Sequence, residues 1–127
     1  MDSIVNYKTS FKQYLEEIRP DLSIQSRKLY ANQLNRIFMN TSLTEFNMMK
    51  FIMRLVNKAK RDKSLDFITL DGSNQTKNQR LAAVRSLLEA NKQALDEKKY
   101  NNLYNLLSEV GDDLRNKISS KAGTNIK

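Results

Sequence analysis

Residues 22–34 read LSIQSRKLYANQL, and residues 75–87 read QTKNQRLAAVRSL. Each stretch opens with polar, hydroxyl-bearing residues, carries cations in its first turns, and has an apolar stripe at helical spacing behind them. Ser23 is placed to cap the first of these helices with its hydroxyl group. Two such helices, about fifty residues apart in a basic chain, predict an all-α protein that grips a polyanion with both.

The composition narrows the class of protein further. The chain has 127 residues, a net charge of +8, 39% hydrophobic residues and 28% charged residues, which suits one well-solvated domain with a modest core. It contains no cysteine and no histidine, so disulfides, thiolate metal sites and the commonest general base are excluded. No apolar run is long enough to span a bilayer, and the N-terminus has no signal-peptide core. We therefore expect a protein that has no membrane partner and is not secreted. We expect it inside the cell, in the compartment that holds its target nucleic acid.

The apolar spacing predicts a compact bundle of about five helices with a long last one. We expect them over Ser3–Ile18, Ile24–Met39, Glu45–Lys60, Thr76–Asn91 and Glu97–Ile118. Pro20 ends the first helix, and Thr44 is expected to cap the third. The segment 61–74 breaks the pattern and holds the β-prone piece 67–70, so we expect a long ordered loop or a brief hairpin arm there. Residues 1–118 would form the domain, and the polar stretch 119–127 would be a flexible linker.

The candidate binding residues lie on the second and fourth expected helices. Amide and guanidinium side chains can hydrogen-bond to base edges, cations neutralise phosphates, and a helix N-terminus offers free N–H groups to a phosphate. No carboxylate occurs from Gln75 until Glu89, whereas an ordinary solvated face mixes both signs. The candidates are Gln25, Arg27, Lys28, Asn32, Arg36, Thr76, Lys77, Asn78, Arg80 and Arg85. A plain solvated surface remains the alternative for both helices, more so for the second than for the fourth.

Other residue patterns point to structure rather than chemistry. The five Tyr and five Phe fall mostly on apolar stripes, which favours core packing over base stacking. The carboxylate pairs 16–17 and 112–113 are adjacent in sequence and so point to different helix faces, which makes an acid–base or metal-ion dyad a poor interpretation. We expect no catalytic residue, no metal site and no cofactor in this chain.

At these two helices the sequence resembles the N-terminal core-binding domain of tyrosine recombinases, the SAM-like helical domain of phage-type integrases. The motif residues are LSIQS at 22–26 followed by Tyr30 and Leu34, and then TKNQRLAAVRSL at 76–87. The resemblance covers about Phe11 to Asn91, and the long fifth helix with its basic tail is similar to versions in large DNA viruses and related mobile elements.

The resemblance implies a DNA-binding half-clamp around a recombination site, with the second and fourth helices approaching the major groove. It also implies that a separate C-terminal catalytic domain of the same protein closes the clamp and performs strand exchange, so 119–127 would lead toward that domain. Double-stranded DNA would be the partner, and self-association on the DNA stays open. The competing interpretation is a helical protein–protein adaptor with a basic surface, in which the fifth helix and the Met-rich third helix form an apolar groove.

Overall fold

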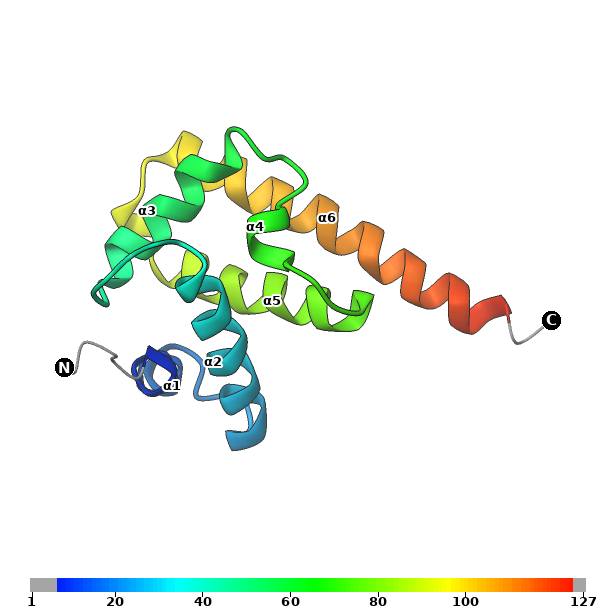
Figure 1. The fold of residues 1–127 in the computed structure, drawn as a ribbon, viewed down its shortest axis with the longest axis horizontal. Helices are drawn as coiled ribbons and strands as arrows, with labels where there is room; N and C mark the ends of the chain where they lie inside the picture. Colours follow the sequence, from blue (N-terminus) through cyan, green and yellow to red (C-terminus); the bar gives the residue numbers. More distant parts are fainter. Residues whose placement is uncertain (1–6, 125–127) are drawn as a thin grey trace.

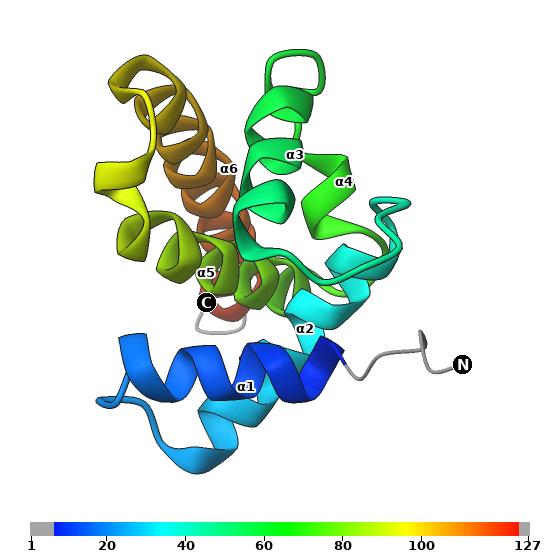
Figure 2. The same ribbon diagram turned by 90° about the vertical axis from the view of Figure 1, so that its left-hand side faces the viewer.

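The protein is a bundle of α-helices arranged around one central helix. The computed structural model describes residues 7–124, with side chains over residues 10–118, and contains no strand within that range. The elements are α1 (Tyr7–Ile18), α2 (Ile24–Met39), α3 (Met48–Ala59), α4 (Asp66–Thr69), α5 (Asn74–Ala90), the short 3-10 helix η1 (Lys92–Ala94) and α6 (Glu97–Thr124). α5 packs against α2, α4 and α6. Figures 1 and 2 show α1 and α2 on one side of α5 and α3 on the other. The expected all-α bundle with a long last helix is confirmed.

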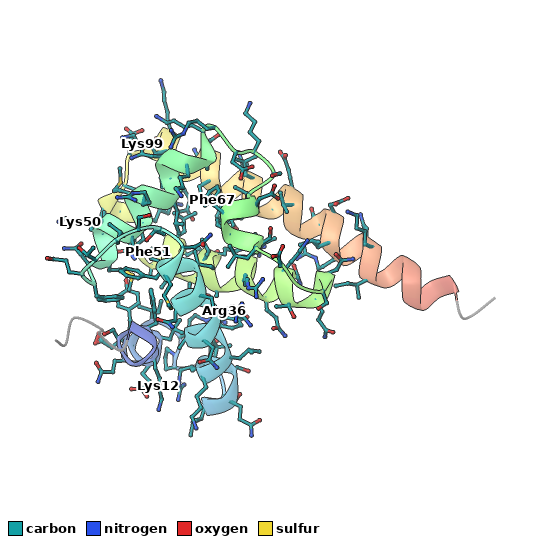
Figure 3. The ribbon with its side chains drawn as sticks, viewed as in Figure 1. Lys12, Arg36, Lys50, Phe51, Phe67 and Lys99 are labelled. Carbon is teal, nitrogen blue, oxygen red and sulfur yellow. The ribbon has the colours of Figure 1, made fainter. Side chains whose placement is uncertain are left out.

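An aromatic cluster joins the N-terminal helices to α3. The ring of Phe11 on α1 lies edge-on to Phe46 and Phe51, with ring centroids 5.0 and 5.4 Å apart. Phe38 on α2 completes the cluster, with its centroid 5.4 Å from that of Phe51. Phe11, Phe38 and Phe51 are fully buried, and Figure 3 shows Phe51 in the interior while Lys50, one residue earlier, lies at the outer edge. Core packing therefore accounts for these aromatic residues.

The helix starts follow side-chain caps. The Ser23 hydroxyl accepts a hydrogen bond from the backbone N–H of Ser26 at 3.1 Å, and α2 spans the residues that the sequence predicts. The third helix differs from expectation, because Asn47 and not Thr44 caps it and α3 begins at Met48. An Asn side chain is as good a cap as a Thr side chain, so the polar run before α3 offers more than one start.

The segment 61–74, predicted as a long ordered loop or a brief hairpin arm, contains the short helix α4 (Asp66–Thr69) and no strand, so the hairpin arm is wrong. Leu65, before the helix, and Leu70, after it, both have positive φ values of 64° and 54°. Leu65 and Ile68 are fully buried. Burial of these apolar side chains against the bundle thus outweighs both the local β-propensity and the strain of two left-handed leucines.

Helix α6 is longer than expected. It begins at Glu97, as predicted, and continues to Thr124, six residues past the predicted end at Ile118. Figure 1 shows its C-terminal half extending away from the other helices. Residues 3–6 of the first expected helix and residues 125–127 of the expected linker lie outside the described residues.

Candidate nucleic-acid interface

The outer face of α2 is the most open surface among the candidate helices. α2 buries Ala31, Leu34, Ile37 and Phe38 on its inner side. The opposite side is exposed and consists of Ile24, Gln25, Lys28, Leu29, Asn32, Arg36 and Met39, which we call the α2 outer face. Lys28, Asn32 and Arg36 recur at four-residue steps, so they lie in a row along the helix. The helix contains no carboxylate.

The side chains in this row are available to a partner. No hydrogen bond or ion pair holds Lys28, Asn32 or Arg36 within the described part of the chain. Three large hydrophobic side chains are exposed among the described residues, and all three belong to the α2 outer face: Ile24 at 61%, Leu29 at 36% and Met39 at 68%. Cations without a partner and the three exposed apolar side chains therefore share one helix face.

A hollow of about 800 Å³ lies at the C-terminal end of this face, between α2, α4 and the start of α5. Its lining includes Arg36 from α2 and Lys77 from α5, and also two carboxylates, Asp66 and Asp71. Lys77 is therefore the α5 candidate that shares a surface with the α2 outer face. The two carboxylates offset the two cations, so the hollow itself is not a strong anion site.

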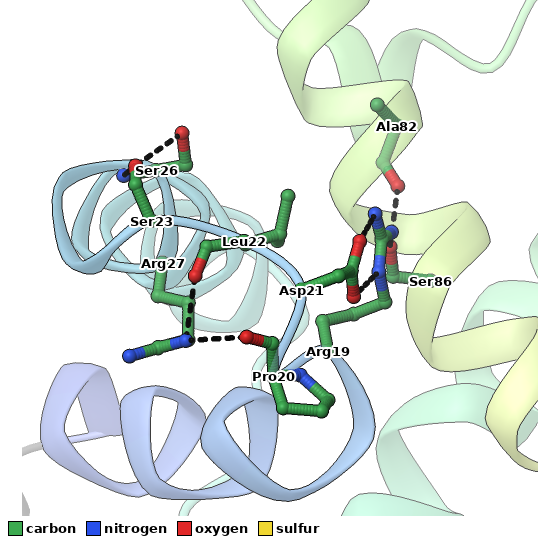
Figure 4. Close-up of polar contacts among 9 residues, drawn as sticks. All are labelled: Arg19, Pro20, Asp21, Leu22, Ser23, Ser26, Arg27, Ala82 and Ser86. Carbon is green, nitrogen blue, oxygen red and sulfur yellow. Dashed lines mark hydrogen bonds and ion pairs between the residues drawn. The ribbon is translucent and has the colours of Figure 1, made fainter.

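Arg27 turns back toward its own helix start instead of outward. Its Nη1 donates to the Leu22 carbonyl at 2.6 Å, and Figure 4 shows the side chain folded over the corner between α1 and α2. In the same corner, Arg19 forms an ion pair with Asp21 at 2.8 Å and donates to Ser86 on α5 at 2.8 Å. The hydrogen bond from Arg19 lowers the pKa of Asp21. The Arg19 bonds thus hold the corner between α1 and α2 against α5.

Arg80 is buried, and the expectation that it lies on the outer side of its helix is wrong. Its Nε donates to Gln33 Oε1 on α2 at 2.7 Å, and its Nη1 donates to the backbone carbonyls of Thr69 and Asp71. These carbonyls flank Leu70, the residue with positive φ after α4. Burial, with a smaller effect of nearby Arg36, lowers the pKa of Arg80. Arg80 thus stabilises the junction of α2, α4 and α5.

The remaining α5 candidates also have structural surroundings. Thr76 lies in the helix cap, where the Ser73 hydroxyl accepts from its backbone N–H and donates to its Oγ1, both at 3.1 Å. Asn78 and Arg85 are half-buried along the seam between α5 and α6, near Gly111. Of the ten sequence-predicted residues, the structure brings five to one surface: Gln25, Lys28, Asn32, Arg36 and Lys77. The other five, Arg27, Thr76, Asn78, Arg80 and Arg85, lie at helix caps, junctions or seams.

A second basic surface lies on α3 and the turn after it, where the sequence offers Lys58, Lys60, Arg61 and Lys63 as possible phosphate contacts, with a plain solvated surface as the equal alternative. Helix α3 and the turn after it carry no carboxylate between Glu45 and Asp62, and Lys50, Lys60 and Arg61 are exposed there. Figure 3 shows Lys50 and Lys99 at the outer edge of the molecule. The sequence signal for such a surface is a run without carboxylates, and this run is as clear in α3 as in α5. Lys58, by contrast, lies over the Phe67 ring, 5.9 Å from its centroid.

Within residues 7–124, no group of three or more acidic side chains lies close enough together to hold a metal ion. No helix in the described range is long and apolar enough to cross a membrane. Comparison with family models, with curated proteins and with solved structures found no match.

Proposed function

We propose that the chain binds duplex DNA by placing the α2 outer face in the major groove, with Lys77 at the start of α5 beside it. One observation carries the proposal: α2 presents Lys28, Asn32 and Arg36 in an exposed row on a helix without a carboxylate. A 16-residue helix is about 24 Å long, and the major groove of B-DNA admits one α-helix.

The chemistry of the row suits this ligand. Lys28 and Arg36 would neutralise phosphates, and Asn32 between them could pair with an adenine edge through two hydrogen bonds. Leu29 and Met39 would give the apolar contacts that thymine methyl groups accept. The +8 net charge favours association with DNA at long range.

The resemblance of residues 11–91 to the core-binding domain supports the same function. Under this proposal the chain is the DNA-binding module of a tyrosine recombinase, and strand exchange belongs to a separate catalytic domain of the same protein. The helices corresponding to the family's two DNA-contacting helices are α2 and α5. α2 would make most of the contacts, because much of the α5 surface packs against its neighbours.

The experiment is a salt titration of binding to generic duplex DNA. Removing two cations that contact phosphates lowers the steepness of log K against log salt concentration by about 1.8. We expect this for the Lys28→Gln/Arg36→Gln variant. The matched control is Lys98→Gln/Lys99→Gln, which removes the same charge from the first turn of α6, across α5 from α2 (Figures 1 and 2). Equal loss of slope in both variants would show that only net charge matters and would contradict the proposal.

A helical adaptor is the second candidate, and the exposure of Ile24, Leu29 and Met39 favours it. If the α2 outer face binds a partner protein, Leu29→Ser or Met39→Ser should lower the affinity for that protein. The affinity should then be insensitive to salt concentration. If the α2 outer face binds DNA, we expect the opposite ranking: the cation variants should bind DNA more weakly than the apolar variants.

A further inference from the structure

The seam between α5 and α6 contains an unusual convergence of polar groups at a glycine. Gly111 is buried inside α6. A Cβ atom placed on it would lie 3.5 Å from Arg115 Nη1, 3.7 Å from Arg85 Nη2 and 3.7 Å from Asn78 Oδ1. Two guanidinium groups, one from each helix, and the Asn78 amide oxygen therefore lie within van der Waals contact of the position that a Cβ on Gly111 would take.

The guanidinium of Arg85 lacks a partner for its charge. No carboxylate and no hydrogen-bond acceptor is paired with Arg85 among the described residues, and its Nε is buried with no hydrogen bond. Arg115 forms an ion pair with Asp112 through its Nη2, and its Nη1, the atom near Gly111, has no hydrogen-bond acceptor among the described residues. A half-buried cation without an acceptor is unfavourable, and a second cation beside it makes it more so.

An oxyanion bound between the two guanidinium groups, on the solvent-exposed side of the seam at Arg115, would give Arg85 an acceptor and offset the positive charge of the pair. A phosphate group offers several strong acceptor oxygens, and guanidinium groups donate to such oxygens with well-matched geometry. The side-chain amide of Asn78 has its Oδ1 near Gly111, and a half-turn of the amide on binding would bring its Nδ2 donor to the oxyanion instead. Arg115 and its ion pair are about half exposed, so the seam is open to solvent on that side.

We propose that Arg85, Arg115 and Asn78 around Gly111 form a phosphate site, and that its ligand is a backbone phosphate of bound duplex DNA. The identity of this ligand rests on the proposed function, whereas the affinity for an oxyanion rests on the seam alone. Asn78 and Arg85 would then contact DNA through the α5–α6 seam and not through an α5 outer face.

The test follows the arginine Nε–Hε signals of the ¹⁵N-labelled chain during titration with generic duplex DNA and, separately, with inorganic phosphate. The Arg85 signal is assigned by its loss in Arg85→Gln. We expect duplex DNA to shift the Arg85 and Arg115 signals and to leave that of Arg80 in place, because Arg80 is buried and its Nε already donates to Gln33.

Two variants and one control complete the test. Arg85→Gln should lower the salt slope of DNA binding by about one unit. Gly111→Ala should weaken DNA binding with the fold intact, because its methyl group would meet the side chains of Arg115, Arg85 and Asn78 at ordinary contact distances and restrict their movement toward a phosphate. Arg61→Gln, which removes one charge from an exposed arginine outside the seam, should leave the Arg85 shift unchanged.

The outcomes separate the two proposals. If duplex DNA binds and depends on Lys28 and Arg36, but the Arg85 signal does not move and Gly111→Ala binds like the wild type, the phosphate site is wrong and the proposed function stands. If duplex DNA does not bind but inorganic phosphate moves the Arg85 signal, the site binds free oxyanions and the proposed function is wrong. If neither ligand moves the signal, the phosphate site is overturned.

Discussion

Helices α2 and α5 start alike and have opposite surroundings. Each follows a serine whose hydroxyl accepts from the backbone N–H three residues later, and each has no carboxylate in its first turns. α2 keeps one long side in solvent, whereas α5 lies between α2, α4 and α6 and buries Arg80. The number of neighbours, and not the polarity of the helix, therefore decides which basic helix can meet a partner.

The largest difference between the helices is expected when a cation of each is removed. Arg80→Met would leave Gln33 and two backbone carbonyls without their donor in a buried junction, and we expect a loss of about 2–4 kcal/mol in the free energy of unfolding. The matched change on α2, Arg36→Met, removes an exposed side chain and should stay within about 0.5 kcal/mol. Urea denaturation of both variants measures this, and equal stabilities would contradict the contrast.

The two caps offer a smaller test, in which the helices should behave alike. Ser23 and Ser73 make the same pair of hydrogen bonds, to a backbone N–H and a hydroxyl, at 3.0 to 3.1 Å. Replacing either with alanine should cost about 1 kcal/mol, measured by thermal or urea unfolding. A much larger loss for one of them would mean that its serine does more than cap the helix.

The smallest expected effect on stability concerns the ion pair of Arg19 and Asp21, in the corner that packs against α5 just before α2 begins. The hydrogen bond from Arg19 lowers the pKa of Asp21 in the folded state, so its stabilising contribution is present above the unfolded pKa near 3.8. That contribution is lost as the pH falls through the lower, folded pKa. Asp21→Asn should therefore reduce stability slightly at neutral pH and flatten the acid limb of the stability profile. An acid limb identical to that of the wild type would show that Asp21 does not contribute.

Local signals were enough to predict much of the fold. Ser23 and Pro20 fix where α2 begins, and helical spacing of apolar residues marks α1, α2, α3, α5 and α6. The segment 66–69 could not be read in this way, because four residues carry no periodicity and their helix depends on burial of Leu65 and Ile68.

The candidate site was predictable only in part. The exposed row on α2 follows from its stripe, since residues opposite Leu34 and Phe38 must face outward. The burial of Arg80 depends on Gln33, which is 47 residues away in the sequence. A helix packed against several other helices has no exposed face for its cations. The sequence alone does not show how many helices will pack against it.

The measurement that tests the central claim most directly is amide chemical-shift mapping of the ¹⁵N-labelled chain with a generic duplex at low salt. We predict the largest changes along α2 at Lys28, Asn32 and Arg36, with smaller changes at Lys77. Changes confined to α3 and the start of α6, or no changes at all, would contradict this prediction.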